Sequence, residues 1–276
     1  MGMLTVLALL AAAPAAPLAP PPGYTLVWRD EFAQAGLPDG KRWAYDTAFN
    51  KAGWHNDEKQ YYAARRKQNS RVEGGHLIVE ARRDGESLRG KADHGGQAYS
   101  SARLVTKGKA AWTYGYFEVR AKLPCSRGTW PAIWTLAARD PMRWPDDGEI
   151  DIMEHVGHEP NVVHQSVHTA AFNHVLGTHK TAQRTVAEAC GAFHLYQLHW
   201  TAESIRMGVD GEEVFRFDKP SNTRAEWPFD GPQYLILNIA VGGMWGGAQG
   251  VDDTAFPQRM EVDYVRVWQA AASPKH

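Results

Sequence analysis

Three carboxylates lie close together in the stretch WPDDGEIDIMEHVG, residues 144–157. Glu149, Asp151 and Glu154 alternate with Ile150 and Ile152, which would be buried if the segment were a strand. Neighbouring carboxylates repel each other and lose hydration when buried, so such a cluster weakens a fold. We therefore expect these three acids to be present for chemistry.

The spacing of the three acids predicts an irregular strand. On a regular strand Glu149 and Asp151 share one face, whereas Glu154, an odd number of residues from Glu149, would face the core. A buried unpaired carboxylate costs too much free energy for that arrangement. We predict a β-bulge near Ile152 and Met153, because one extra residue returns Glu154 to the face of the other two acids.

Two facing carboxylates with different pKa values are the catalytic pair that hydrolysis of a glycosidic bond requires. One stays ionised and attacks the anomeric carbon, while the other stays protonated and donates to the leaving oxygen. The spacing alone does not decide which acid has which role. The alternative is an acidic surface strand paired with Lys or Arg, which the interleaved isoleucines and the change of phase argue against.

Short strands are the elements that would position these acids. Alternating runs separated by Gly, Asp, Asn and Pro occur at residues 76–82, 115–123, 193–200, 205–209 and 261–268. The run GYFEVRAKL, residues 115–123, predicts one solvent-facing side that includes Tyr116 and Glu118, and one buried side. Asp210-Gly211 lies between two runs and predicts a hairpin.

Helical periodicity is weak throughout, and residues 58–67 (EKQYYAARRK) are the candidate for one or two helical turns. Many strands without alternating helices predict an all-β sandwich of two antiparallel sheets.

Composition narrows the class of protein. The chain has 276 residues, of which 43% are hydrophobic, so it can bury a large core as one domain. Its net charge of -1, with acids and bases interspersed, argues against a nucleic-acid or anionic-membrane partner. The 11 Trp and 10 Tyr residues are many, and flat aromatic side chains are costly to expose unless they stack on a partner such as a sugar ring.

The first residues resemble a secretory signal. An apolar run, residues 3–13, is followed by small residues of A-x-A type, although no Lys or Arg precedes it and the cleavage site is ambiguous between Ala13 and Ala19. The run is too short to span a membrane, and no later apolar segment is long enough. We expect a leader at 1–19, a single catalytic domain at 20–276, and a secreted protein, extracellular or periplasmic. The alternative is a disordered Ala/Pro leader that stays attached.

The carboxylate stretch resembles the catalytic signature of glycoside hydrolase family sixteen, E-[ILV]-D-[IVAF]-x-E. The similarity extends over nearly the whole chain after the leader, through segments at 28–32, 53–62, 101–124, 128–136, 193–201, 235–247 and 262–268. Within that family the chain is most similar to bacterial endo-1,3-β-glucanases, the laminarinases. The resemblance implies a β-jelly-roll sandwich with the substrate in a cleft on its concave sheet, and a β-glucan polysaccharide as partner.

The same resemblance implies roles for the three acids. Glu149 would be the nucleophile, Glu154 the general acid/base, and Asp151 would hold and tune the pair. A negative Glu149 raises the pKa of Glu154, and this effect disappears once Glu149 is esterified, so that Glu154 can then act as a base. This retaining double displacement needs no cofactor.

The resemblance also implies four substrate-binding residues, Asn56, Arg103, Trp130 and His168. We add Trp134, four residues from Trp130 on the same face of a strand, and Trp245. Indole rings stack on sugar faces and donate directional hydrogen bonds. From the residues alone, Trp130 and Trp134 are equally compatible with a core position, although Trp130 between Thr129 and Pro131 favours the cleft. Trp245 lies among glycines, which are too small to bury it, and Arg103 could instead pair with an acid on a neighbouring strand.

A structural calcium ion is a further implication of the resemblance, with Glu31, Gly75 and Asp263 as its residues. Oxygen ligands from carboxylates and backbone carbonyls suit this hard cation. The site would join the first and last strands. We expect no metal for catalysis, and we expect a monomer.

Four alternatives remain open. Mixed-linkage β-1,3-1,4-glucan is an alternative substrate within the same family, and a β-glucan-binding lectin would share the fold but would be expected to lack one of the glutamates. A zinc site formed by His164, His168 and Glu154 is conceivable, although no close Cys/His spacing is present. Cys125 and Cys190 are either a disulfide or two free thiols.

Overall fold

The predicted strands form two packed antiparallel sheets in a computed structural model that describes residues 17–271. Most of the predicted leader therefore lies outside the described residues. The predicted all-β sandwich is confirmed, and short 3₁₀ turns make up its helical content: η1 (His55–Asp57), η2 (Gly85–Leu88) and η3 (Asp253–Ala255).

The outer sheet has eight strands, in the order β15-β14-β13-β8-β17-β5-β4 with β1 added beside β17. Their bounds are β1 (Tyr24–Asp30), β4 (Ser70–Glu73), β5 (His76–Ala81), β8 (Gly115–Lys122), β13 (His194–Trp200), β14 (Ser204–Val209), β15 (Glu212–Asp218) and β17 (Gln258–Ala270). The inner sheet has seven strands, in the order β12-β11-β10-β9-β16-β7-β2. Their bounds are β2 (Ala44–Tyr45), β7 (Arg103–Val105), β9 (Thr129–Ala137), β10 (Glu149–His155), β11 (Val162–His168), β12 (Lys180–Thr185) and β16 (Gln233–Val241).

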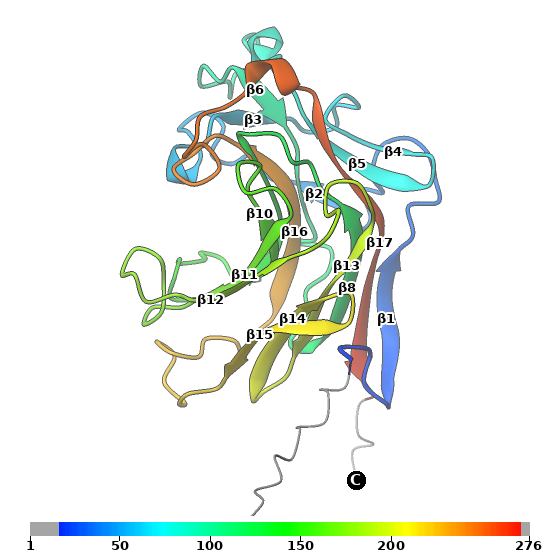
Figure 1. The fold of residues 1–276 in the computed structure, drawn as a ribbon, viewed down its shortest axis with the longest axis vertical. Helices are drawn as coiled ribbons and strands as arrows, with labels where there is room; N and C mark the ends of the chain where they lie inside the picture. The colour runs from blue at the N-terminus through cyan, green and yellow to red at the C-terminus, as the bar shows by residue number, and fades with distance from the viewer. Residues whose placement is uncertain (1–16, 272–276) are drawn as a thin grey trace, which may run out of the picture.

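One continuous apolar core fills the space between the sheets. Figure 1 shows β10, β11 and β16 on one side of the molecule, with β1, β8, β13 and β17 on the other. Ile150 and Ile152 from the inner sheet join Phe117 and Val265 from the outer sheet in this core, all at most 1% exposed. Fully burying each such side chain stabilises the fold by about 1.5–3 kcal/mol. This packing holds β10, the strand that carries the three acids.

Local signals predicted the hairpin correctly. Asp210 and Gly211 join β14 to β15 with positive φ angles of 53° and 82°. Both residues of a type I′ turn need this conformation, which Asp-Gly adopts readily.

The predicted helical turns at 58–67 are wrong. Gln60–Tyr62 forms β3, which pairs in parallel with β6 (Tyr99–Ser101). Tyr61 and Tyr62 are buried, at 5% and 1% exposure, so long-range pairing and burial outweigh the weak local helical preference.

The predicted solvent-facing side of β8 is also wrong at two positions. Tyr116 is 0% and Glu118 is 9% exposed. The backbone carbonyl of Leu18, far away in sequence, accepts hydrogen bonds from Tyr116 and Gln197 and lies over this part of the sheet. The strand alternates as predicted, but a distant segment covers the face expected to be wet.

No helix within residues 17–271 has the length and apolar character needed to cross a membrane. The structure joins Cys125 to Cys190 in a disulfide, one of the two alternatives that the sequence left open.

Candidate active site

The predicted bulge on β10 is present and brings the three acids to one face. The pairing of β10 with β11 shifts register between Asp151 and Glu154, and its pairing with β9 shifts between Asp151 and Met153. Ile150, Ile152 and Met153 are 0% exposed in the core. The extra residue therefore points into the core, and Glu154 turns to the same side as Glu149.

The three acids lie in a cleft of about 940 Å³ on the inner sheet. The cleft extends from Tyr45 on β2 to His174 in the connection between β11 and β12. Its lining includes Glu149, Asp151 and Glu154, four of the six predicted substrate-binding residues (Asn56, Arg103, Trp130 and Trp134), and further aromatic and polar side chains (Phe49, Trp54, His55, Glu58, Trp144, Tyr234 and Asn238).

Burial dominates the electrostatics of the three acids. It raises the pKa values of Glu149 and Asp151 well above their ordinary range, and the like charges within the cluster act in the same direction. Burial also raises the pKa of Glu154, while His168 and the indole of Trp130 act against it. Three neighbouring buried carboxyls cannot all be ionised, so the cluster holds protons at a pH where exposed acids have lost theirs.

Each glutamate receives one indole hydrogen bond. Trp130 on β9 donates through Nε1 to Glu154 Oε1 at 3.0 Å. Trp144 donates through Nε1 to Glu149 Oε2 at 3.1 Å, from the connection between β9 and β10. Because Trp130 lines the cleft, it can hold Glu154 and present its ring to a ligand at the same time.

His168, expected from the sequence to donate to a sugar hydroxyl or to a carboxylate, lies beside two of the acids. It is 6% exposed and lies behind the acids, with Nε2 3.4 Å from Asp151 Oδ2 and 3.8 Å from Glu149 Oε1. Its ring packs on His174 and His179, and His174 lines the cleft instead. His168 can therefore influence the charge of the acids, but it is placed to contact them and not a ligand in the cleft.

The other predicted zinc ligands do not gather around Glu154. His164 stands opposite Glu154 in the strand register, but its Nε2 contacts Glu159 at 3.2 Å and its ring packs on Trp245. Among the described residues, the acids and histidine that come within metal-ligand distance of one another in the cleft are Glu149, Asp151 and His168.

Arg103 is both an ion-pair partner and part of the cleft. Its Nε lies 3.0 Å from Asp46, and its guanidinium stacks on Trp54 and Trp134 at 5.1 and 4.7 Å from the ring centroids. Trp134 in turn donates through Nε1 to Asn238 at 2.7 Å. These contacts build a rigid floor beside the acids.

Asn56 and Trp245 lie near the Glu154 end of the cleft. Asn56 adopts a left-handed conformation with φ of 58°, and its carbonyl accepts from Met244 N–H at 2.7 Å. Trp245 packs edge-on against Trp130 at 5.3 Å and is not part of the cleft lining, whereas its neighbour Met244 is. Trp245 therefore supports the Trp130 ring from the side.

A buried aspartate outside the cleft holds the segment that carries Trp144. Asp147, 1% exposed, accepts from Arg143 N–H at 2.7 Å, from Arg139 at 3.0 Å and from Arg224. Burial acts to raise the pKa of Asp147, but the hydrogen bonds from Arg143 N–H and Arg224 outweigh it and the pKa lies below its ordinary value. This charge network fixes the start of β10.

The predicted calcium residues are engaged in other contacts. Both oxygens of Glu31 accept from Arg266 at 2.8 Å, and Asp263 accepts from Arg120 at 2.6 Å. Gly75 lies in the tight turn between β4 and β5, and β1 does pair with β17 as expected. A divalent cation at these residues would therefore have to displace Arg266 and Arg120 from the two carboxylates.

Sequence reasoning missed Trp144, the donor to Glu149, and several other lining residues, including Phe49, Trp54, His174 and Met244. A signal for Trp144 was available. It precedes a proline, which disfavours regular structure, and it lies five residues before Glu149 in a turn-rich stretch.

Comparisons with known proteins agree with this geometry. The model of the family described as Glycosyl hydrolases family 16 matches residues 57–266. A β-glucanase of Rhodothermus marinus is 52% identical over 256 residues, 90% of this chain and 86% of that protein. The structure of the laminarinase from Rhodothermus marinus has a TM-score of 0.83 at 52% identity, covering 90% of this chain and 98% of that one.

A second solved structure adds a ligand to the comparison. It is a non-specific endo-β-1,3(4)-glucanase from the same family, with a TM-score of 0.89 and 54% identity, covering 94% of this chain and 100% of that one. That protein, a Glu-to-Ser variant, presents a 1,3-β-D-cellobiosyl-glucose at its active site.

Proposed function

The chain belongs to glycoside hydrolase family 16, and on that premise we propose that it hydrolyses internal β-1,3-glucosidic bonds of laminarin-type β-1,3-glucans with retention of configuration. One observation carries the proposal: the bulged strand β10 directs Glu149, Asp151 and Glu154 into one cleft lined by tryptophans. The similarity to the Rhodothermus marinus laminarinase supports the substrate class.

Glu149 is the nucleophile in this proposal. Burial raises the pKa of Glu149 well above its ordinary range, and the nearby His168 and the indole N–H of Trp144 act in the opposite direction, toward the ionised form that attacks. The carboxylate attacks the anomeric carbon, and a covalent glycosyl-enzyme forms as the leaving oxygen departs. His168, held behind the acids, offsets part of their mutual repulsion.

Glu154 is the general acid and then the general base. Burial raises its pKa, so it carries the proton that the leaving oxygen needs. When Glu149 becomes an ester its charge disappears, the pKa of Glu154 falls, and Glu154 can accept a proton from the attacking water. Trp130 keeps the carboxyl in place through both steps.

Asp151 is a positioning residue between the two glutamates. It is 2% exposed, and Glu149, two residues away on the same face of β10, acts against the pKa increase that burial causes in Asp151. In this proposal Asp151 orients Glu149 and shares protons with it, and the double displacement needs no cofactor.

The dimensions of the cleft support attack within a chain. The lining residues extend over four strand spacings from β2 to β10, about 19 Å at the usual distance between strands, and His174 and Val175 continue the lining beyond β10. A cleft of this length across the sheet admits several sugar units. Mixed-linkage β-1,3-1,4-glucan is the second candidate substrate, favoured by the 1,3(4) activity of the second solved relative.

Product analysis tests the proposed function. The protein is treated with a chelator, then incubated with laminarin, lichenan, agarose and carboxymethylcellulose. We expect a ladder of oligosaccharides from laminarin, formed early and with the β-anomer first. Activity on lichenan alone would favour the mixed-linkage alternative, binding without products would indicate a lectin, and loss of activity on chelation would indicate a catalytic metal.

Export and processing are part of the proposal. We place the end of the proposed secretory leader, expected at residue 19 from the sequence, on the N-terminal side of Leu18, because Leu18 is 4% exposed and its carbonyl accepts from Tyr116 and Gln197. N-terminal sequencing of the exported, monomeric protein checks this. A mature chain that starts at Pro20 would contradict it.

A structural Ca²⁺ at Glu31, Gly75 and Asp263 is a proposal that rests on the family resemblance alone, since Arg266 and Arg120 would have to release the two carboxylates. Elemental analysis together with the melting temperature in chelator decides it. Absence of calcium and an unchanged melting temperature would remove the proposal.

A further inference from the structure

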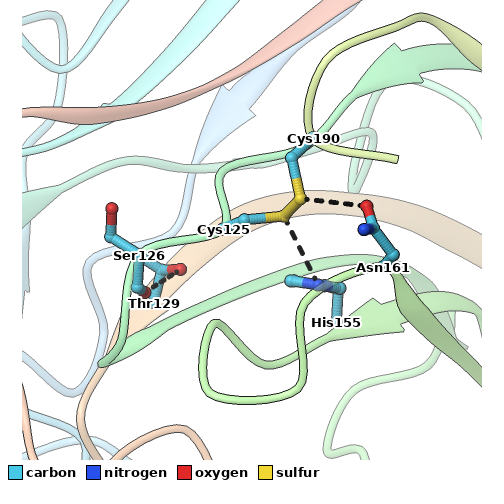
Figure 2. The surroundings of a disulfide bond; sticks show 6 residues. All are labelled: Cys125, Ser126, Thr129, His155, Asn161 and Cys190. Atoms are coloured by element: carbon cyan, nitrogen blue, oxygen red, sulfur yellow. Dashed lines mark hydrogen bonds between the residues drawn. A yellow bond between two sulfur atoms is a disulfide. The ribbon is translucent and has the colours of Figure 1, made fainter. Parts of the chain in front are cut away.

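Four potential metal-binding atoms converge at the end of β10, outside the cleft. Figure 2 shows the Cys125–Cys190 disulfide with His155 on one side and Asn161 on the other. His155 Nε2 lies 3.5 Å from Cys125 Sγ, and Asn161 Oδ1 lies 3.4 Å from Cys190 Sγ. The two sulfurs and His155 Nε2 are all within 4.8 Å of one another.

These distances match the edges of a tetrahedral zinc site. With Zn–S near 2.3 Å and Zn–N or Zn–O near 2.0–2.1 Å, sulfur lies about 3.5 Å from a nitrogen or oxygen ligand of the same ion. The two sulfurs of such a site lie about 3.8 Å apart, so they need to separate only after the bond between them is broken. Each of the other two donors is already at ligand spacing from one of the sulfurs.

His155 is buried and its Nε2 is placed to bind a metal ion. It is 0% exposed, while both cysteines are half-buried and can be reached from solvent. Its Nε2 is the ring nitrogen that faces Cys125 Sγ, and in the neutral ring with the proton on Nδ1 this nitrogen presents a lone pair toward the sulfurs.

We propose that the chain in its reduced state binds one Zn²⁺ through Cys125, Cys190 and His155, with Asn161 supplying an oxygen as fourth ligand. The four ligands come from four separate connections and strand ends: β8–β9, β12–β13, the end of β10 and β10–β11. Two thiolates and one divalent cation are together neutral, which suits a half-buried site.

A phosphine can supply the two electrons needed to reduce the Cys125–Cys190 disulfide. The S–S bond takes up two electrons and two protons to give two thiols, while the phosphine takes oxygen from water and becomes a phosphine oxide. Each thiol releases its proton when it binds the ion. The ion then links the same connections that the disulfide links, one residue from Glu154.

Cobalt is the probe that tests the site. The protein is reduced with a phosphine without oxygen, desalted and titrated with Co²⁺. We expect one equivalent to produce thiolate-to-cobalt charge-transfer bands and the intense visible bands of tetrahedral Co²⁺, and we expect Zn²⁺ to bleach them. Disulfide-bonded protein given the same Co²⁺ should show neither. A folded, reduced protein without these bands would overturn the proposal.

Two variants locate the ion. His155→Gln should weaken Co²⁺ binding by at least about tenfold. His158→Gln is the matched control, since His158 lies in the same segment and contacts Glu159 instead of the sulfurs. Equal Co²⁺ affinity in the two variants would contradict the proposal.

X-ray absorption of the zinc-loaded wild-type protein keeps the test decisive if His155→Gln fails to fold. Two sulfur and two nitrogen or oxygen neighbours are expected, and a shell without sulfur would refute the site. Should the reduced wild-type chain itself unfold, refolding that depends on Zn²⁺ would support the proposal, and failure to refold with Zn²⁺ would contradict it.

Discussion

Buried carboxylates on the two sheets show how this fold separates stability from chemistry. On the outer sheet Glu118, 9% exposed, accepts from Tyr116 at 3.2 Å, from Gln197 at 3.1 Å and from Tyr264 at 2.8 Å. On the inner sheet Asp151 is 2% exposed, yet its Oδ2 has no hydrogen-bond partner among the described residues. His168 lies 3.4 Å from that oxygen without hydrogen-bond geometry.

Glu118 and Asp151 differ in the side chains that surround them. Glu118 is surrounded by donors, which compensate for lost hydration and leave it no proton-transfer partner. Asp151 lies between Glu149 and Glu154, and burial keeps the pKa values of all three acids high. A fully satisfied carboxylate stabilises the fold, whereas an under-satisfied cluster holds protons that a reaction can use.

Among the variants of the cleft, replacing the general acid/base Glu154 should reduce kcat the most. Glu154→Gln removes the proton donor, so kcat on laminarin should fall about 10²–10⁴-fold. The melting temperature should not decrease, because Gln has the shape of the protonated carboxyl, adds no charge to the cluster and can still accept from Trp130. Steady-state kinetics and thermal unfolding measure both, and a kcat within tenfold of the wild type would disprove the role of Glu154.

Removing a cleft ring should have a smaller effect. Trp130→Ala removes a stacking surface and the hydrogen bond to Glu154, so kcat/KM on long glucan should fall. The fall should correspond to a loss of about 1–3 kcal/mol of transition-state stabilisation. The free energy of unfolding should fall by less than the transition-state stabilisation does. An unchanged rate with a large drop in melting temperature would instead assign Trp130 a purely structural role.

The outer-sheet acid should show the opposite pattern. Glu118→Gln directs an amide NH₂ toward existing donors, so the free energy of unfolding should fall by about 1–3 kcal/mol. The kcat on laminarin should stay within about twofold, since Glu118 lies on the other sheet. Urea denaturation and kinetics check this, and a variant that loses activity but not stability would undo the comparison.

The smallest expected effect is a shift in pH dependence. It is measured in a variant that removes the Trp130 hydrogen bond but keeps an aromatic ring. The indole N–H lowers the pKa of Glu154, so Trp130→Phe should raise it further. The acid must be protonated to act, and the alkaline limb of the kcat/KM profile should therefore move to higher pH. Trp245→Phe, which alters the ring packed against Trp130, is the control. A limb that stays in place or moves to lower pH would contradict the pKa direction.

Period-two patterns predicted the core and the bulge because burial leaves a direct mark on the sequence. Three acids out of phase with two isoleucines require an extra residue, and the register shift lies where that reasoning puts it. The predictions that were wrong concerned residues whose burial depends on contacts with distant parts of the chain. Tyr116 is buried because Leu18 lies over it, and Tyr61 because β3 pairs with β6. No local pattern contains those partners.

The candidate site shows the same division. The motif located Glu149, Asp151 and Glu154, and the family resemblance located Trp130. The place of His168 behind the acids depends on the packing of the segment that carries His174 and His179, which strand periodicity does not describe.

The stereochemistry of azide rescue tests the central claim most directly. Glu154→Ala with an aryl β-glucoside whose leaving group needs no protonation should still form the glycosyl-enzyme on Glu149. Azide then attacks this intermediate and gives a β-glycosyl azide with recovered rate. In Glu149→Ala, azide takes the vacated space and gives the α-glycosyl azide. The α product from Glu154→Ala would reverse the two roles and contradict the assignment of Glu149 as nucleophile.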